Sequence, residues 1–185
     1  LRSAVNTVIV AMQMGIPVAR IELLDDVQMD ACIRYSKLDG YEAKPTLFFE
    51  FHGTQAGVAE QAGQMQALVA EHGGGAFRWA TAPEERTKLW KARHNAYYAG
   101  LALKPGSFGF ATDACVPISQ LATAVLESVQ EAEASRIPYF MVGHVGDGNF
   151  HMGYLIDPES SEERAKAEQL NHQLVARALR LGGTC

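Results

Sequence analysis

One short segment, Gly143–Gly153, constrains the fold of this chain more than any other. It contains Asp147-Gly148, a dipeptide that strongly signals a tight two-residue turn between antiparallel strands. With these two residues as the loop, His144 lies directly opposite His151. Directly paired residues have Cβ atoms about 4.5–5.5 Å apart and point to the same face of the sheet. The segment therefore predicts a β-hairpin that carries two adjacent imidazoles.

The two arms of this hairpin alternate between apolar and polar side chains. One face is mostly apolar and typical of a core: Met141, Gly143, Val145, Phe150, Met152 and Tyr154. The other face is mostly polar or small: Val142, His144, Gly146, Asn149, His151 and Gly153. A slip of one residue would move the histidines to the apolar face, so we expect a well-specified register.

The rest of the chain alternates strand-like and helix-like patterns. Strands are predicted at Val18–Leu24, Thr46–Phe51, Phe77–Ala80, Gly109–Val116, Tyr139–Val145 and Asn149–Ile156. Helices are predicted around 5–12, 26–36, 55–72, 84–98, 119–129 and 160–181. This pattern predicts an α+β fold, a ferredoxin-like sandwich in which a largely antiparallel sheet has helices packed on one face. A doubly wound nucleotide-binding fold is disfavoured, because no G-x-G-x-x-G follows a predicted strand.

Composition narrows the classes of protein. The chain has 185 residues, 48% of them hydrophobic and 20% charged, with a net charge of −5, which indicates a globular domain and argues against a nucleic-acid partner. No apolar run approaches the roughly 20 residues of a transmembrane helix. Three cysteines without framework spacing favour reduced thiols and an intracellular setting. The chain starts without Met and ends just after a predicted helix, so we expect residues 1–185 to belong to a longer protein.

The histidine pair is the first candidate site. Two imidazoles can coordinate one divalent cation at about 2.0–2.1 Å, and catalytic zinc sites commonly add a carboxylate as third ligand. Asp147 lies in the predicted turn, and we interpret it first as a residue that forms the turn. From spacing alone, a metal or catalytic role for His144 and His151 and a plain surface role are about equally favoured.

Arg93 is the second candidate. It lies on a predicted helix in one stripe with Leu89, Trp90 and Tyr97. A guanidinium fork binds a carboxylate with two hydrogen bonds. A salt-bridged or snorkelling arginine is the simpler alternative on the residues alone. Tyr97 and Asn149 are further candidates for substrate binding.

The sequence GHVGDGNFH at 143–151 resembles the signature of the FAD-linked oxidases related to D-lactate dehydrogenase and glycolate oxidase. Further segments resemble the cytochrome-linked D-lactate dehydrogenase branch: 17–25, 31–38, 45–53, 90–98 and 112–119. The likeness covers nearly the whole chain. It implies that residues 1–185 are most of the C-terminal cap domain, which contributes the substrate site and follows an FAD-binding portion.

The resemblance also implies roles for individual residues. His144 and His151 match the family's two metal-ligating histidines, with Zn or Mn as the divalent metal, and Arg93 matches the arginine that binds the substrate carboxylate. The third ligand is a glutamate in a Gly-Glu-His-Gly segment, whose histidine is the base. We expect that segment after Cys185.

The implied activity is an FAD-dependent D-2-hydroxyacid dehydrogenase that oxidises D-lactate to pyruvate. Relatives acting on 2-hydroxyglutarate have a lysine where this chain has Ala111 and an asparagine where it has Gly153, so a small monocarboxylate is favoured. D-2-hydroxyglutarate and glycolate remain alternatives. The resemblance implies a cytochrome or quinone acceptor and a cytoplasmic location or a peripheral one at the inner membrane, mitochondrial in a eukaryote.

Two other classes stay open. A metal-dependent hydrolase would use the histidine pair to activate water and would need a third ligand within residues 1–185. A non-catalytic α+β module would use the sheet for binding or dimerisation, and a homodimer is an open possibility for the enzyme as well. For the isolated chain we expect no activity, no FAD binding and no tight metal binding.

Overall fold

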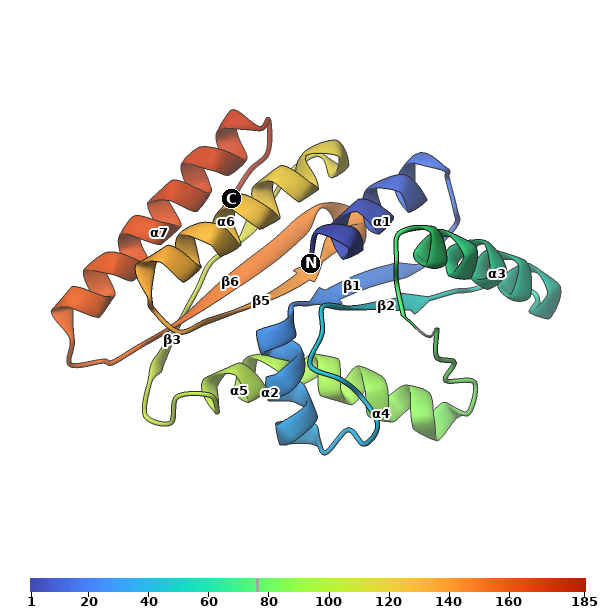
Figure 1. Cartoon of the computed structure of the whole chain (residues 1–185), viewed down its shortest axis with the longest axis horizontal. Helices are drawn as coiled ribbons and strands as arrows, with labels where there is room; N and C mark the ends of the chain where they lie inside the picture. The colour runs from blue at the N-terminus through green and yellow to red at the C-terminus, as the bar shows by residue number, and fades with distance from the viewer. Residues whose placement is uncertain (76) are drawn as a thin grey trace.

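A computed structural model of the chain describes residues 1–75 and 77–185. Within these residues an open sheet lies between two layers of helices (Figure 1). The first layer contains α1 (Arg2–Gln13), α3 (Gln55–Glu71), α6 (Leu121–Ser135) and α7 (Ser161–Arg180). The second layer contains α2 (Asp26–Ser36), α4 (Pro83–His94) and α5 (Ala96–Leu101). None of the described helices is both long and apolar enough to cross a bilayer.

The sheet is built from antiparallel pairs. Its strands are β1 (Arg20–Leu24), β2 (Thr46–Glu50), β3 (Phe108–Ala111), β4 (Ala114–Cys115), β5 (Tyr139–His144) and β6 (Asn149–Ile156). The order is β2-β1-β5-β6-β3, and β4 also pairs with β6. The predicted α+β architecture with a largely antiparallel sheet is confirmed. The hairpin strands β5 and β6 occupy the middle of the sheet.

The prediction of helices on one face is incomplete, because α2, α4 and α5 cover the second face. The reason lies in the side chains of the central strands, which are apolar on both faces. Met141 and Met152 face the first helix layer, whereas Phe140 and Leu155 belong to a separate core with α2 and α5. Burying both faces of a sheet requires a helix layer on each side.

Two glycines allow this second helix layer to approach the sheet closely. Phe140 of β5 packs its ring against Gly100 of α5 and directly across from Gly153 of β6. A Cβ atom at Gly100 or Gly153 would lie 2.4 Å or 2.2 Å from the Phe140 ring. The missing side chains therefore let one aromatic ring fill the space between helix and sheet.

The register of the central hairpin differs from the predicted one by two residues. His144 pairs with Asn149, and Val142 pairs with His151. The loop has four residues, a 3-10 turn at Val145–Asp147 followed by Gly148 in the left-handed conformation. The predicted faces survive, because a shift of two residues keeps every side chain on its own side.

Packing explains the longer loop. Val145 is fully buried and folds back over Gly143, where an added Cβ atom would lie 2.9 Å from its Cγ1. Gly148 accepts a hydrogen bond from the N–H of Val116 through its carbonyl oxygen at 3.0 Å. The contact with Val116 comes from a distant segment of the chain, so the local dipeptide signal could not include it.

The predicted strand at Phe77–Ala80 is wrong, since these residues are irregular. The segment packs through side chains instead of strand pairing. The Phe77 ring stacks on Phe49 of β2 at 5.9 Å between centroids and packs at a tilt against Trp79 at 4.9 Å. These aromatic contacts give packing partners to the apolar side chains that had indicated a strand.

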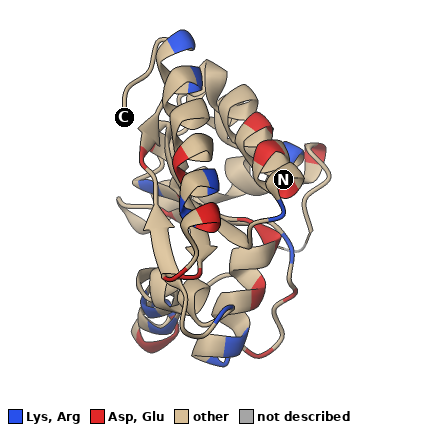
Figure 2. Ribbon diagram, turned by 90° about the vertical axis from the view of Figure 1, so that its left-hand side faces the viewer, with Lys and Arg blue, Asp and Glu red and all other residues tan. Residues whose placement is uncertain are grey.

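Charged residues join α6 to α7 and are spread over the surface. The buried Arg177 of α7 donates to Glu127 at 2.9 Å and to Ser128 at 2.8 Å on α6, and also contacts Glu131. Elsewhere on the side drawn in Figure 2, Lys and Arg residues are interspersed with Asp and Glu.

Candidate active site

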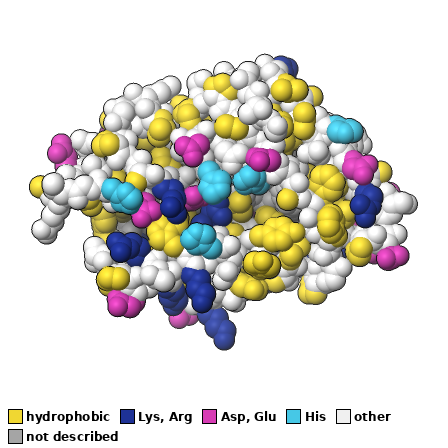
Figure 3. Space-filling model, turned by 180° about the vertical axis from the view of Figure 1, so that it is seen from behind, with side chains coloured by type: hydrophobic (Ala, Val, Ile, Leu, Met, Phe, Trp, Pro, Cys, Tyr) yellow, Lys and Arg dark blue, Asp and Glu magenta, His cyan; other side chains and the backbone are white. Residues whose placement is uncertain are grey.

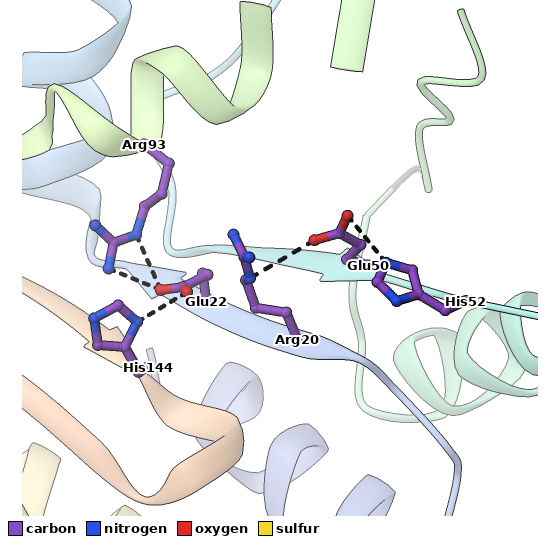
Figure 4. Close-up of polar contacts among 6 residues, drawn as sticks. All are labelled: Arg20, Glu22, Glu50, His52, Arg93 and His144. Atoms are coloured by element: carbon purple, nitrogen blue, oxygen red, sulfur yellow. Dashed lines mark hydrogen bonds and ion pairs between the residues drawn. The ribbon is translucent and has the colours of Figure 1, made fainter. Parts of the chain in front are cut away.

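The candidate site is organised around Glu22 of β1, a carboxylate whose side chain is 5% exposed. The side chain is placed by its strand, in which alternate residues point to the second helix layer. His144 donates through Nδ1 to Glu22 Oε1 at 2.9 Å. Arg93 of α4 donates through Nε at 3.1 Å and Nη2 at 2.8 Å to Glu22 Oε2 (Figure 4). The two oxygens of one carboxylate thus hold two of the residues that the sequence singled out, His144 and Arg93.

The second histidine is held in the same way by a backbone carbonyl. Nδ1 of His151 lies 3.0 Å from Thr112 O and 3.5 Å from Asp113 Oδ1. A carbonyl oxygen can only accept a hydrogen bond, so Nδ1 of His151 carries the hydrogen. The carboxylate of Glu22 assigns the same tautomer to His144. With the hydrogen on Nδ1, Nε2 is the nitrogen of each ring that can bind a metal ion through its lone pair.

The two imidazoles are neighbours, as predicted, but along a diagonal of the hairpin. Their ring centroids are 5.8 Å apart and their planes are inclined by 86°. His144 is half-exposed and His151 is 29% exposed, so both rings reach the surface. Figure 3 shows histidine side chains gathered on this face together with basic and acidic ones.

The donor set fits a divalent cation with two protein ligands. Two imidazoles with fixed Nδ1–H groups are suitable ligands for zinc or manganese. Within 1–75 and 77–185 no group of three His, Cys, Asp or Glu side chains is placed to hold a metal ion.

Asn149 lies beside the histidines, directly across from His144. Its Nδ2 donates to Asp113 Oδ1 at 2.7 Å and to the carbonyl oxygen of Ala114 at 3.1 Å. Both amide hydrogens are thereby used. Asn149 can offer a ligand only its carbonyl oxygen, as an acceptor.

Tyr97 is placed on the same face of the sheet but beyond Phe140. Its ring centroid is 6.5 Å from that of Phe140, and its hydroxyl approaches the carbonyl oxygen of Gly109 at 3.4 Å. Among the described residues, those that line the cleft next to Arg93 and His144 do not include Tyr97. The structure thus brings Arg93, His144, His151 and Asn149 together and leaves Tyr97 at the margin.

A cleft of about 440 Å³ opens beside Glu22. Its lining includes Arg20, Glu22, Trp90, Arg93, His94 and His144. The Arg20 guanidinium lies over the indole of Trp90, 4.5 Å from the ring centroid, and its Nε is 3.6 Å from Glu50 Oε2. The cleft therefore has two cationic side chains, Arg20 and Arg93, each beside a carboxylate, and its lining also includes the acidic Asp147.

Sequence reasoning missed Glu22 as a site residue. Its signal was present, because Glu22 is an acidic residue between the apolar residues Ile21 and Leu23 in a predicted strand. A carboxylate is rarely fully buried unless it is paired. Arg20 and His94 had no comparable signal, since charged residues at the ends of elements are usually solvated.

The model of the family described as "FAD linked oxidases, C-terminal domain" matches residues 1–185. The chain belongs to this family. Its members are FAD-linked, so FAD is the cofactor of the proteins in which this FAD-oxidase C-terminal domain occurs.

Curated relatives of the domain are oxidoreductases. It is 42% identical to D-lactate dehydrogenase (cytochrome), mitochondrial, of Arabidopsis thaliana, over 100% of the chain and 32% of the relative. It is 32% identical to D-lactate dehydrogenase (cytochrome) 1, mitochondrial, of Saccharomyces cerevisiae, over 94% of the chain and 30% of the relative. It is 29% identical to glycolate oxidase subunit GlcD of Bacillus subtilis, over 90% of the chain and 35% of the relative. The domain spans about a third of the length of these relatives.

Solved structures share the fold of the domain. The 4-ethylphenol oxidase of Gulosibacter chungangensis matches with a TM-score of 0.68 and 13% identity, covering 99% of this chain and 42% of that one. A p-cresol methylhydroxylase with bound substrate matches with a TM-score of 0.66 and 14% identity, covering 97% and 41%. At these identities the likeness concerns the fold alone.

Proposed function

We propose that this domain forms the substrate-binding portion of an FAD-dependent D-2-hydroxyacid dehydrogenase that oxidises D-lactate to pyruvate. The observation that carries the proposal is the arrangement around Glu22. One buried carboxylate holds an arginine suited to a substrate carboxylate and a histidine suited to a cation, at the wall of one cleft. The 42% identity to a D-lactate dehydrogenase supports this choice of reaction.

In the proposed site, Arg93 binds the substrate carboxylate and fixes its orientation. Asn149 accepts a hydrogen bond through its carbonyl oxygen. Tyr97 is proposed to bound the substrate position from the margin of the site. FAD, when bound, would supply the redox chemistry of the oxidation, while this domain would supply orientation and electrostatics.

His144 and His151 are the proposed ligands of a divalent cation, zinc or manganese, through their Nε2 atoms. Such a cation, when bound, would polarise the 2-hydroxyl group of the substrate and lower its pKa. The third ligand and the base that accepts the hydroxyl proton are proposed to come from a Gly-Glu-His-Gly segment that follows residue 185.

Two positions in the central sheet favour a monocarboxylate over 2-hydroxyglutarate. Ala111 and Gly153, where relatives specific for the dicarboxylate have lysine and asparagine, are directly paired between β3 and β6. The Phe140 ring occupies the space that a side chain at Gly153 would need. Both polar groups that would bind a second carboxylate are thus missing from one spot, and the packing leaves no room for an asparagine there.

The electron acceptor is proposed to be a cytochrome or a quinone, and the location to be peripheral at the inner mitochondrial membrane in a eukaryote. The relatives named as mitochondrial, cytochrome-type D-lactate dehydrogenases support the cytochrome acceptor and the mitochondrial location. Reduction of cytochrome c and of a soluble quinone by the lactate-reduced enzyme would distinguish the two acceptors.

The proposed function is tested with His144→Ala and His151→Ala in the full-length flavoenzyme. We expect bound metal and kcat with D-lactate to fall together, by at least a hundredfold in kcat, because either substitution removes one protein ligand. His172→Ala on the exposed side of α7 is the control and should leave both unchanged. Full turnover by either variant after removal of metal would contradict the metal assignment.

A further inference from the structure

Glu22 has a position that packing alone does not explain. It is buried, and the other buried residues of its strand, Ile21, Leu23 and Leu24, contribute apolar side chains to the two cores. A buried carboxylate is costly unless its charge is balanced and its oxygens accept hydrogen bonds. Here each oxygen has its own partner, since Oε1 accepts from His144 and Oε2 accepts twice from Arg93.

The contact with Arg93 determines which edge of its guanidinium can meet a ligand. Nε and Nη2 together form the side edge of the group, and both donate to Glu22 Oε2. The five N–H donors of an arginine lie in a fixed plane. The edge formed by Nη1 and the outer hydrogen of Nη2 therefore remains for a carboxylate in the cleft, and its direction is set by Glu22.

The contact with His144 determines which nitrogen of the ring can meet a cation. A carboxylate next to Nδ1 favours the hydrogen on that atom and orients the plane of the ring. It leaves the Nε2 lone pair on the opposite side. One residue on β1 thus controls the orientation of a residue on α4 and the tautomer of a residue on β5.

We propose that Glu22 is the positioning residue of the active site, which aligns Arg93 for the substrate carboxylate and His144 for the cation at the same time. This inference rests on the proposed function, because it assigns Glu22 a task only if Arg93 and His144 have theirs. Glu22 itself does not touch the substrate or the cation. Its effect is on the geometry of the two groups that do.

A matched control lies on the neighbouring strand. Glu50 of β2 pairs across the ladder with Arg20, and its carboxylate also contacts one arginine and one histidine, Arg20 at 3.6 Å and His52 at 3.3 Å (Figure 4). Glu50→Gln removes the same charge from the same kind of triad, one strand away. It should leave metal affinity and kcat within twofold of the wild type.

The test compares Glu22→Gln, Glu22→Asp and Glu50→Gln in the full-length flavoenzyme. The amide of Glu22→Gln can serve His144 or Arg93 but not both, so we expect at least a tenfold weaker Zn²⁺ affinity in chelator competition and at least a tenfold lower kcat per bound flavin. Loss of the negative charge strengthens anion binding, whereas misalignment of Arg93 weakens it. Because the two effects oppose each other, KM for D-lactate should change less than threefold. Glu22→Asp keeps the charge with a shorter side chain and should recover some of both losses.

A purely structural ion pair gives a different result. It would lower the melting temperature and the yield of flavin-loaded enzyme, while the enzyme that remains would have the wild-type kcat and Zn²⁺ affinity. That outcome would overturn the proposal. It would leave the proposed function intact as long as His144→Ala loses metal and turnover, whereas a fully active His144→Ala would refute the proposed function itself.

A measurement on the unmutated enzyme covers the case in which Glu22→Gln does not fold. In metal-free, flavin-loaded protein labelled with ¹⁵N-histidine, the His144 ring should give the ¹⁵N shifts of the neutral tautomer with its hydrogen on Nδ1. The signal is assigned by its disappearance in His144→Ala. A His144 ring with its hydrogen on Nε2 would contradict the positioning role of Glu22.

Discussion

Arg93 carries its charge on a planar fork, and Glu22 already occupies one edge of that fork. The sequence left two possibilities open for Arg93, a salt-bridged arginine and one that binds a substrate carboxylate. The geometry is compatible with both. Arg93 is salt-bridged and 11% exposed, and it still borders the cleft. A salt bridge to a neighbour does not exclude a role in binding, because a guanidinium has more donors than one carboxylate oxygen uses.

Replacing Arg93 by lysine keeps the charge and removes the fork. We expect Arg93→Lys in the full-length enzyme to lower kcat/KM for D-lactate at least tenfold, because a single ammonium group cannot bind Glu22 and hold a substrate carboxylate by two parallel hydrogen bonds. Steady-state kinetics with D-lactate measure this. Lys91→Arg, the reverse exchange on the same helix, is the control. A loss of kcat/KM below threefold in Arg93→Lys would remove Arg93 from the site.

Asp25 makes stability depend on pH. Its Oδ1 caps α2 by accepting from the N–H of Gln28 at 2.7 Å, while burial raises the pKa of its carboxyl from 3.8 to about 7. A raised pKa in the folded state means that folding favours the protonated form, so its contribution to stability is complete below pH 4 and is lost as the pH rises through 7. Each pKa unit corresponds to about 1.4 kcal/mol.

Asp25→Asn should remove this dependence and keep the cap, because asparagine is an equally good N-cap residue. We expect the free energy of unfolding of the variant, relative to the wild type, to increase between pH 4 and pH 7 and to level off above pH 7. Urea denaturation at pH 4.5, 6 and 8 measures it. A constant difference across this range would show that Asp25 does not titrate there.

At the scale of elements, the sequence predicted the faces of the β5–β6 hairpin but not its register. Alternation fixes which side chains share a face, and this placed His144 and His151 together. The register depends on the loop, and the loop depends on Val145 and Gly148, whose contacts lie on other segments. Local dipeptide preferences contain no information about those contacts.

A substitution at Gly148 tests the importance of this loop. Gly148 has a φ of 78°, and a Cβ atom there would lie 2.1 Å from the carbonyl oxygen of Val116. Gly15 has a similar φ of 67° with nothing within 4 Å of an added Cβ atom. Gly15→Ala should therefore cost about 1–2 kcal/mol from the backbone conformation alone.

Gly148→Ala should cost at least about 2 kcal/mol more than Gly15→Ala, because the loop or β4 must also move. Chemical denaturation of the two variants measures the difference. We also expect Gly148→Ala to lower the metal affinity of the full-length enzyme, since Asn149 and His144 flank the loop. Equal destabilisation by the two substitutions would show that the loop tolerates the added methyl group.

At the scale of the whole molecule, the second helix layer is the feature that sequence patterns could not supply. The sheet residues on that face, such as Phe140 and Val142, are apolar and could have been assigned to either core. Arg93 reaches Glu22 only because α4 lies over this face. Sequence reasoning therefore singled out Arg93 and His144 as candidates but missed Glu22, and it could not predict that a helix and a hairpin bring both residues to this one carboxylate.

The two-ligand arrangement predicts how metal binding is divided over the protein. Residues 1–185 alone should bind Zn²⁺ or Mn²⁺ at least a hundredfold more weakly than the full-length flavoenzyme, because the described residues offer two imidazoles and no cluster of three donors. Titration of both proteins against a chelating dye compares the affinities. Equal affinities would mean that the domain contains its own third ligand.

The stacking of Arg20 on Trp90 also gives the cleft an optical reporter. The chain has only two tryptophans, and one of them, Trp90, belongs to the cleft wall beneath a cation. Indole emission responds to the electric field of a nearby charge. An anion that draws the guanidinium of Arg20 away from the ring would therefore shift the fluorescence of Trp90, and occupancy of the cleft could be followed by light emission before any chemistry takes place.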